Sequence, residues 1–331
     1  MKYAVYLVVF LWMGLVQAAD PLPSWNEGNI KKEIISFVND VTKENGSRFV
    51  KPEDRIATFD NDGTLWSEVP TIELEFTKFR MKEILAANPA LKKQEPYKSL
   101  LAKAAGADVK LTQKQILDIV AKTHSGMSEE EFGKQVREFF KEARHPKLHV
   151  PYTQAVYQPM LELLAYLREN NFQIFISSGG EIAFMRQVVP EIYGIPTQNI
   201  IGSFFVDKTE EKNGRLQVMR TAQLGLLNDK GGKPVGIVRH IGKRPIISVG
   251  NERNGGDIEH LRFSSESSLP NFQIMVNHDD AEREAAYSEK DNASLNAAKK
   301  FGFKVLSMKN DWKQIFPVAD KIAQQKQNDH K

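Results

Sequence analysis

The 331-residue chain contains no cysteine, which excludes disulfide bonds, metal sites built on thiolates and a lipoprotein anchor. It also lacks an excess of charge of one sign, since 45 Lys and Arg residues stand against 42 Asp and Glu residues, for a formal net charge of +3. The charges are interspersed and form no long basic block, so nucleic acid is not an expected partner. Apolar residues make up 41% of the chain, which is enough for the core of a globular protein.

Long apolar runs are also scarce, and the most prominent one lies at the N-terminus. Lys2 precedes an unbroken apolar run from Ala4 to Val16, and Gln17-Ala18-Ala19 follows it. This pattern is typical of a secretory signal peptide, so residues 1–19 are predicted to be one, with cleavage after Ala18. The run is short for a bilayer span, although an uncleaved anchor is the alternative. A cysteine-free exported chain fits the bacterial periplasm, where we expect the mature protein to have no stable membrane anchor.

A long helical region interrupts the chain after its first predicted strand. That strand runs from Arg55 to Asp60, and beyond it apolar residues recur at helical spacing as far as about residue 150. No strand-like alternation occurs in this region of the sequence. We therefore predict a helical insertion over residues 67–150, which divides an α/β core into residues 20–66 and 151–331.

Strands and helices alternate in the rest of the chain. Helices are predicted at 31–44, 111–123, 130–143, 153–170, 181–189, 233–241 and 311–326. Strands are predicted at 172–177, 245–250, 272–277 and 303–308, and a β-hairpin at 200–206 and 215–219. Alternating strands and helices are typical of a doubly wound, Rossmann-like parallel sheet, so the fold class is predicted to be α/β.

The most informative segment follows the first predicted strand and reads Asp60-Asn61-Asp62-Gly63-Thr64. Residues i and i+2 of a strand point to the same side, so a turn at Gly63 would bring the Asp60 carboxylate close to the side chain and carbonyl of Asp62. Two acids this close need a nearby cation, and hard oxygen ligands suit Mg²⁺. A carboxylate held in this way can attack a phosphoryl group and form an aspartyl-phosphate. The alternative is that Asp-Gly-Thr only closes a turn.

The pattern Asp-x-Asp-Gly-Thr-Leu after an apolar strand resembles motif I of the haloacid dehalogenase-like (HAD) hydrolases in their phosphatase form. The resemblance implies that Asp60 is the nucleophile, that Asp62 is the general acid and base, and that both lie at the metal. It also places Thr64 at the substrate. The helical insertion has the position of a C1-type cap in that family, which would close over the site and exclude water.

The segment Ser177-Ser178-Gly179-Gly180 follows a predicted strand and precedes a predicted helix. It resembles motif II of the same family. A hydroxyl and free backbone N–H groups at a helix N-terminus form a ready anion site. The resemblance is to the phosphoserine-phosphatase-like members, and it implies that Ser178 binds the phosphate of the substrate, with Gly179 beside it. Ser177 remains the alternative.

Lys233 opens a predicted helix and resembles the lysine of motif III. By that resemblance its ammonium would neutralise the nucleophile and the incoming phosphate. Lys230 and Lys243 are the alternatives, because position in the series of motifs is the only support for any one of them.

The loop from Gly250 to Asp257 resembles motif IV, where an acid or amide and a later acid complete the metal site. Asn251 stands where an aspartate is often found, and the loop is longer than usual. An amide oxygen can bind Mg²⁺ but brings no charge, which should weaken binding. Asp257 is therefore expected to be the more important ligand, with Glu252 as a substitute.

Together these motifs resemble the phosphoserine-phosphatase-like HAD hydrolases, and the segments 277–284 and 308–313 also resemble an exported subgroup of them. The resemblance implies Mg²⁺-dependent hydrolysis of a small phosphorylated metabolite through an aspartyl-phosphate. Another reaction of the family, such as phosphoryl transfer, is one alternative. A non-catalytic exported protein that binds phosphate or another ligand is the second, supported by Asn251. Trp66 could form a pocket wall or pack in the core. His278 follows a predicted strand and could line the site, but it is expected to be solvated or structural.

Overall fold

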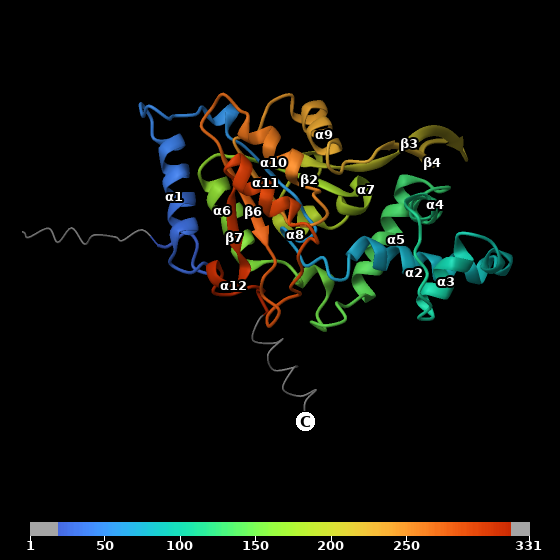
Figure 1. The fold of residues 1–331 in the computed structure, drawn as a ribbon. Coiled ribbons are helices and arrows are strands. Elements are labelled where there is room, and N and C mark those ends of the chain that lie inside the picture. The colour runs from blue at the N-terminus through green and yellow to red at the C-terminus, as the bar shows by residue number, and fades with distance from the viewer. Residues whose placement is uncertain (1–18, 319–331) are drawn as a thin grey trace, which may run out of the picture.

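The structure is a computed structural model that describes residues 19–318, so the predicted signal peptide lies outside the described residues except for Ala19. Seven strands form one sheet in the order β4-β3-β2-β1-β5-β6-β7 (Figure 1). All neighbouring strands are parallel except β3 and β4, which are antiparallel. The strands are β1 (Ile56–Phe59), β2 (Gln173–Glu181), β3 (Ile200–Lys212), β4 (Arg215–Leu226), β5 (Ile247–Asn251), β6 (Phe272–Asn277) and β7 (Lys304–Ser307).

Helices cover both faces of the sheet, as strand β6 makes clear. Ile274 and Val276 lie in the larger apolar cluster, together with residues of the helices α1 (Asn29–Thr42) and α6 (Gln158–Glu169). Met275, between them, lies in a second cluster with residues of α10 (Ile258–Ser265) and α11 (Ala293–Phe301). Because successive side chains of a strand point to opposite faces, the two clusters lie on opposite sides of the sheet. The predicted doubly wound α/β fold is confirmed.

Four helices lie between β1 and α6 and form a separate layer beside the sheet (Figure 1). They are α2 (Ile72–Ala87), α3 (Tyr97–Ala104), α4 (Gln113–His124) and α5 (Glu129–Glu142). Capping boxes at Thr112 and Ser128 begin α4 and α5, and in each the two side chains accept from two backbone N–H groups at the helix start. The Phe76 ring of α2 packs in the centre, against rings from α5 and the core.

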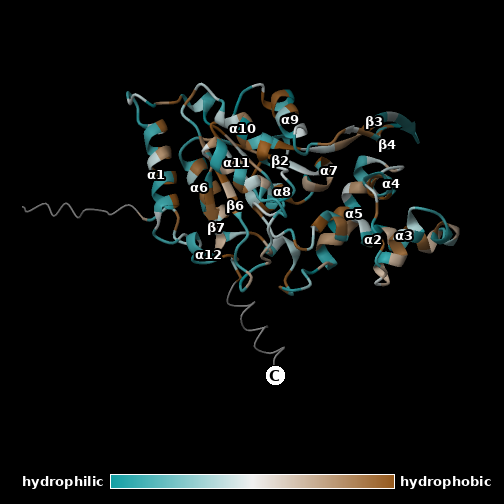
Figure 2. Ribbon diagram, in the orientation of Figure 1, coloured by the Kyte–Doolittle hydropathy of each residue, from teal (hydrophilic) through white to brown (hydrophobic). Residues whose placement is uncertain are grey.

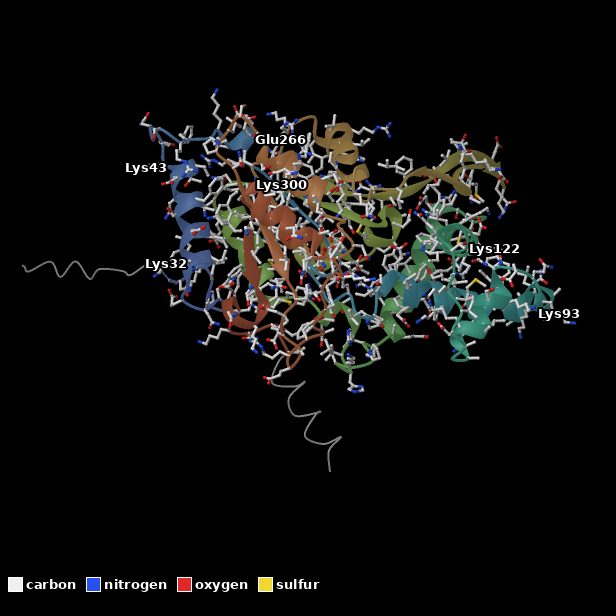
Figure 3. The ribbon with its side chains drawn as sticks, in the orientation of Figure 1. Lys32, Lys43, Lys93, Lys122, Glu266 and Lys300 are labelled. Carbon is white, nitrogen blue, oxygen red and sulfur yellow. The ribbon has the colours of Figure 1, made fainter. Side chains whose placement is uncertain are left out.

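The apolar and charged side chains separate as expected for a folded domain. Figure 2 shows hydrophobic residues along the strands and inner helix faces, whereas the tip of the β3–β4 hairpin is hydrophilic. Charged side chains at the periphery of both the core and the insertion are exposed (Figure 3), among them Lys32, Lys43, Lys93, Lys122, Glu266 and Lys300. No helix within residues 19–318 is both long and apolar enough to cross a membrane.

Strand β2 is longer than predicted. It continues through Ser178, Gly179 and Gly180, because after an irregularity it pairs again with β3 at Glu181. The helix predicted at 181–189 is therefore wrong as one element. Two short helices replace it, α7 (Ile182–Met185) and α8 (Val189–Tyr193).

Two other predicted helices differ in extent. The one predicted at 153–170 begins only at Gln158, where Pro159 occupies the first turn and suits a helix start. The one predicted at 311–326 is wrong for its described part, because the short α12 (Met308–Asp311) ends there and Trp312 then pairs with Trp25. Short 3₁₀ segments occur at Pro52–Asp54, Pro89–Lys93, Tyr152–Gln154 and Thr197–Asn199, and α9 spans Gly232–Ile241.

The β3–β4 hairpin is also longer than predicted, and it contacts the helical insertion through Arg220. The guanidinium of Arg220 donates to Glu181 at the end of β2 (2.8 Å), to Glu129 of α5 (2.6 Å) and to the His124 carbonyl of α4 (2.7 Å). Arg220 is only 3% exposed. A buried cation of this kind must be paired, so this side chain joins the hairpin, the insertion and the sheet.

Replacement of Arg220 by alanine is expected to lower the free energy of unfolding by about 3–5 kcal/mol, because it leaves the Glu181 carboxylate buried without its cation. Urea unfolding followed by circular dichroism measures this change. Arg215→Ala, at the exposed start of β4, is the control and should change stability by less than about 0.5 kcal/mol. A loss as small as the control's would contradict this role of Arg220.

Candidate active site

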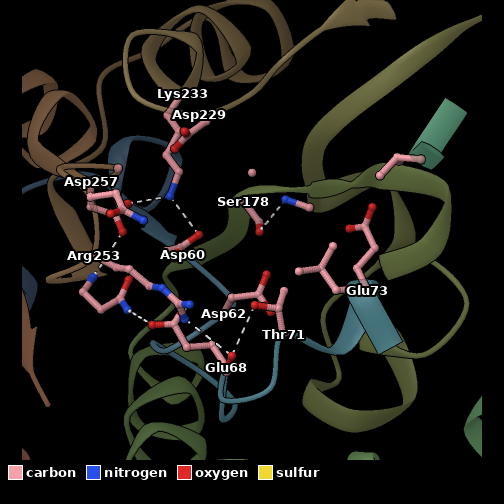
Figure 4. A pocket seen from close by; sticks show the side chains of 17 residues that line it. Asp60, Asp62, Glu68, Thr71, Glu73, Ser178, Asp229, Lys233, Arg253 and Asp257 are labelled. Atoms are coloured by element: carbon pink, nitrogen blue, oxygen red, sulfur yellow. Dashed lines mark hydrogen bonds and ion pairs between the residues drawn. The ribbon is translucent and has the colours of Figure 1, made fainter. Parts of the chain in front are cut away.

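The predicted site residues meet in one cavity at the carboxyl ends of β1, β2 and β5, which are neighbours in the sheet. This is the edge at which open α/β sheets bind ligands. The cavity has a volume of about 280 Å³ and is shown in Figure 4. Of the predicted residues, those that line it are Asp60, Asp62, Ser178, Gly179, Lys233, Asn251 and Asp257.

Lys233 lies between two acids at the bottom of this cavity. Its Nζ is 2.8 Å from Oδ1 of Asp60 and 2.6 Å from Oδ1 of Asp257, and the lysine is 2% exposed. Burial alone would lower the pKa of Lys233, but the two carboxylates outweigh it and raise that pKa, so the ammonium stays charged. The alternatives lie elsewhere: Lys243 pairs with Asp54 at the surface, and Lys230 lines a neighbouring cleft.

The pKa values of the two acids beside Lys233 shift in opposite directions. Burial and the nearby Asp257 raise the pKa of Asp60 well above its usual range, against the opposing effect of Lys233. For Asp257, burial is outweighed by Lys233 and by the hydrogen bond from His260, which together lower its pKa to about 2. Asp257 is therefore the anion that fixes the lysine.

Asp62 lies close to the end of β1, and burial raises its pKa to about 6. The indole N–H of Trp66 donates to its Oδ1 at 2.8 Å and lowers that pKa in part. Trp66 is buried between the rings of Phe140 and Tyr193, so it packs in the core and also orients Asp62. A carboxyl group with a pKa near 6 can give and take a proton near neutral pH.

Gly63 makes the turn that carries Asp62 back toward the sheet. Its φ is +72°, which favours glycine, and an added Cβ would lie 2.1 Å from Nδ2 of Asn251 and 2.7 Å from Oε1 of Glu68. The ring of His278 lies beneath the turn, with Nε2 2.7 Å from the Gly63 carbonyl oxygen. His278 therefore supports this turn from outside the cavity.

Ser178, and not Ser177, reaches the cavity. The Ser178 hydroxyl lies 3.1 Å from the backbone N–H of Gly180, whereas the Ser177 hydroxyl is buried against Asn228 at 3.3 Å. The predicted helix start after Ser178 is wrong, because this segment is the end of β2 and the four-residue α7 begins only at Ile182, whereas the anion site stays a prediction. Thr64 is fully buried and is not among the residues that line the cavity.

The donors present fit Mg²⁺ bound with part of its water shell. The Asp60 carboxylate, Asp62 and the Asn251 amide offer hard oxygen atoms, and Mg²⁺ typically uses one or two carboxylates together with water and substrate phosphate. Both oxygens of Asp257 are engaged, one by Lys233 and His260 and the other by the backbone N–H of Asn251. Within residues 19–318 no three acidic, histidine or cysteine side chains form a ready metal group.

The motif IV loop positions Lys233 through Asp257. Both oxygens of Asp257 accept hydrogen bonds, one of them from Lys233, and its role as the stronger metal ligand stays a prediction. Glu252, the predicted substitute, lines a neighbouring cleft together with Lys230. Asn251 lines the cavity together with Asp60.

Sequence reasoning missed several residues of the cavity. Five of them lie within residues 67–150 and two lie in core loops: Glu68, Thr71, Glu73, Leu74 and Val120, and Asp229 and Arg253. Glu68 is 6% exposed and pairs with Arg253 at 2.8 Å. None of these residues stands in a short motif. The close spacing of Glu68 to Asp62 was the one signal that could have indicated it.

Glu73 on α2 faces the cavity opposite Ser178 (Figure 4). Its Oε2 accepts from the backbone N–H of Glu181 at 2.8 Å, and its Oε1 lies 3.6 Å from Nε2 of His124. Burial raises the pKa of Glu73 to about 8 and lowers that of His124 to about 3. Since Nδ1 of His124 is 2.9 Å from the Val120 carbonyl, the ring presents an unprotonated Nε2 to a protonated Glu73.

This protonated acid predicts a pH dependence of stability. Between the usual pKa of about 4.5 and the folded value of about 8, the folded chain holds a proton that the unfolded chain has lost, so rising pH destabilises the fold. Glu73→Gln is neutral throughout. Its stability relative to the parent should therefore rise with pH in this window, by at most about 1.4 kcal/mol per pH unit.

Urea unfolding at about pH 5 and about pH 8 measures the effect. Glu75→Gln on the same helix is the matched control, and we expect it to change stability by less than about 0.5 kcal/mol. The same difference between Glu73→Gln and the parent at both pH values would contradict a protonated Glu73.

Comparison with solved structures finds similar proteins at low sequence identity. A conserved functionally unknown protein from Anaerococcus prevotii is 12% identical, with 84% of this chain and 91% of the other covered and a TM-score of 0.53. A protein of unknown function from Bordetella pertussis is 15% identical, with 76% and 97% covered and a TM-score of 0.49. A phosphoserine phosphohydrolase-like protein from Francisella tularensis is 17% identical, with 76% and 94% covered and a TM-score of 0.40.

Of these three, only the first exceeds a TM-score of 0.5, and at 12% identity it shows a shared fold. A comparison with curated protein sequences found no significant match. A family comparison does match: residues 57–225, more than half of the chain, match the haloacid dehalogenase-like hydrolases. This region begins within β1, ends within β4 and includes Asp60, Asp62 and Ser178. The chain therefore belongs to the haloacid dehalogenase-like hydrolase family.

Proposed function

We propose that the protein is an exported, Mg²⁺-dependent phosphatase that hydrolyses a small phosphomonoester through an aspartyl-phosphate on Asp60. One observation carries the proposal: the buried Lys233 ammonium touches Asp60 at 2.8 Å, at the bottom of a cavity that Asp62 and Ser178 also line. A carboxylate, a fixed cation, a second carboxyl group and a hydroxyl are the groups that phosphoryl transfer to an aspartate requires.

In the first step, an oxygen of the Asp60 carboxylate attacks phosphorus and the bond to the leaving oxygen breaks. Asp62 gives its proton to that oxygen. In the second step, Asp62 takes a proton from water, the water oxygen attacks phosphorus, and the bond to Asp60 breaks, which restores the carboxylate. Lys233 and Ser178 lie where they can bind the phosphoryl oxygens. When bound beside Asp60, Asp62 and Asn251, Mg²⁺ would supply positive charge to the phosphoryl group.

The helical insertion is proposed to act as a cap that chooses the substrate. It contributes the side chains of Thr71, Glu73, Leu74 and Val120 to the wall opposite the sheet. With about 280 Å³ for the phosphoryl group and the leaving group together, the cavity favours a small ester. Export to a periplasm remains a proposal that rests on the N-terminal sequence, and N-terminal sequencing of the secreted protein tests it.

The first experiment is phosphate release from an aryl phosphate by the mature chain, with Mg²⁺ and with EDTA. We expect release with Mg²⁺, none with EDTA, and at least a 10³-fold loss of kcat in Asp60→Asn, because the amide is not a nucleophile. Thermal unfolding checks that the variant is folded. If Asp60→Asn keeps the activity of the parent, the nucleophile is assigned wrongly. Phosphate binding without any turnover would favour a non-catalytic binding protein.

The acid role of Asp62 predicts a dependence on the leaving group. Asp62→Asn should lose about 10²–10⁴-fold in kcat/KM on an alkyl phosphate, whose alkoxide needs a proton, and less on an aryl phosphate, whose phenolate leaves without one. Initial rates with both substrates measure the ratio. Asp229→Asn changes another carboxylate at the cavity wall, and its losses in kcat/KM on the two esters are compared with those of Asp62→Asn. Equal losses of Asp62→Asn on the two esters would contradict protonation of the leaving oxygen.

A further inference from the structure

The metal side of the cavity carries an amide, Asn251, at a position where a carboxylate would bring charge. We propose that Glu68 supplies that negative charge from behind Asn251, and that Glu68 and Tyr287 together turn the amide so that its oxygen faces the cation. This inference rests on the proposed Mg²⁺ site. It assigns to Glu68 and Tyr287 a positioning role in metal binding.

The first support is the hydrogen-bond geometry of the amide. Nδ2 of Asn251 donates to Oε1 of Glu68 at 2.9 Å and to the hydroxyl of Tyr287 at 2.8 Å. The Tyr287 hydroxyl in turn donates to the same Glu68 oxygen. A carboxylate only accepts hydrogen bonds, so the amide atom that faces Glu68 is the nitrogen. The amide nitrogen is thereby engaged by Glu68 and Tyr287, and Oδ1 is the side-chain atom of Asn251 that could bind a cation.

The second support is the position of Glu68 against the loop that carries Asp62. The Cβ that Gly63 lacks would lie 2.7 Å from Oε1 of Glu68 and 2.1 Å from Nδ2 of Asn251. The carboxylate, the amide and the turn therefore share one tightly packed volume. A negative charge at this place acts across a short, poorly screened distance on whatever lies beside Asn251 and Asp62.

Arg253 pairs with the other oxygen of Glu68 at 2.8 Å, but it does not cancel the effect. The side chain of Arg253 is 39% exposed, against 6% for Glu68, so water screens the arginine more than the carboxylate. Partners that orient a metal ligand in this way commonly change metal affinity by about 10–100-fold when they are removed.

Glu68→Gln separates the charge from the hydrogen bonds, because the glutamine carbonyl can still accept from Asn251 and Tyr287. We expect calorimetric titration of the variant with Mg²⁺ to give a Kd about 10–100-fold higher than that of the parent. Glu266→Gln, an exposed carboxylate on the core surface, is the matched control and should leave the Kd unchanged. An unchanged Kd in Glu68→Gln would overturn the proposal.

A charge exchange distinguishes this role from a merely structural one. In the double variant Glu68→Gln with Asn251→Asp, the carboxylate moves from behind the amide to the ligand position. We expect the Mg²⁺ Kd to return to within about threefold of the parent, and a Kd as high as that of Glu68→Gln alone would overturn the exchange of charge. If Glu68→Gln fails to fold, Tyr287→Phe is the second variant. It should raise the Kd several-fold, and an unchanged Kd would contradict the orientation of the amide.

Metal binding and turnover are read out separately. Phosphate release by the parent, together with an unchanged Mg²⁺ Kd in Glu68→Gln, would reject the inference and leave the proposed function standing. A parent that releases no phosphate but shows the expected changes in Kd would reject the phosphatase and support the role of Glu68. A parent that binds no Mg²⁺ by calorimetry would overturn the inference itself.

Discussion

The site depends on one buried ion pair network, in which the Lys233 ammonium lies between the carboxylates of Asp60 and Asp257. Three formal charges at under 10% exposure would be unfavourable alone, because each loses its hydration. The three charges are tolerated because packing in the core holds their side chains against one another. Asp60 lies at the end of β1, Lys233 at the start of α9 and Asp257 at the start of α10. The core thus maintains an arrangement that short peptides could not hold.

The two aspartates of this network, Asp60 and Asp257, have different roles. Asp257 accepts from Lys233, His260 and the backbone N–H of Asn251, and through these contacts it holds the lysine in place. Asp60 has fewer partners and faces the cavity, which leaves an oxygen for chemistry. A different number of hydrogen bonds, and not a different residue type, separates the positioning aspartate from the reactive one.

Much of this arrangement could be predicted from the sequence, since strands with strong apolar runs such as 272–277 and the residues after them are local signals. The predictions failed where distant segments decide. Ser178-Gly179-Gly180 looks like a turn, yet pairing with β3 extends the strand through it. Trp312 looks helical, yet contact with Trp25 ends the helix. Glu73 and Arg253 reach the cavity through tertiary packing alone, and no spacing in the sequence records that contact.

The position of Arg220 has a consequence for how the helical insertion can move. An insertion tied to its core by two linkers alone can swing on them as on a hinge. Here the β3–β4 hairpin adds a third attachment. Its Arg220 forms one ion pair with Glu181 in the sheet and another with Glu129 in the insertion. Any wide opening must separate the arginine from one of them or carry the hairpin along. Small sideways shifts that keep both pairs intact are thus the less costly way for a substrate to enter.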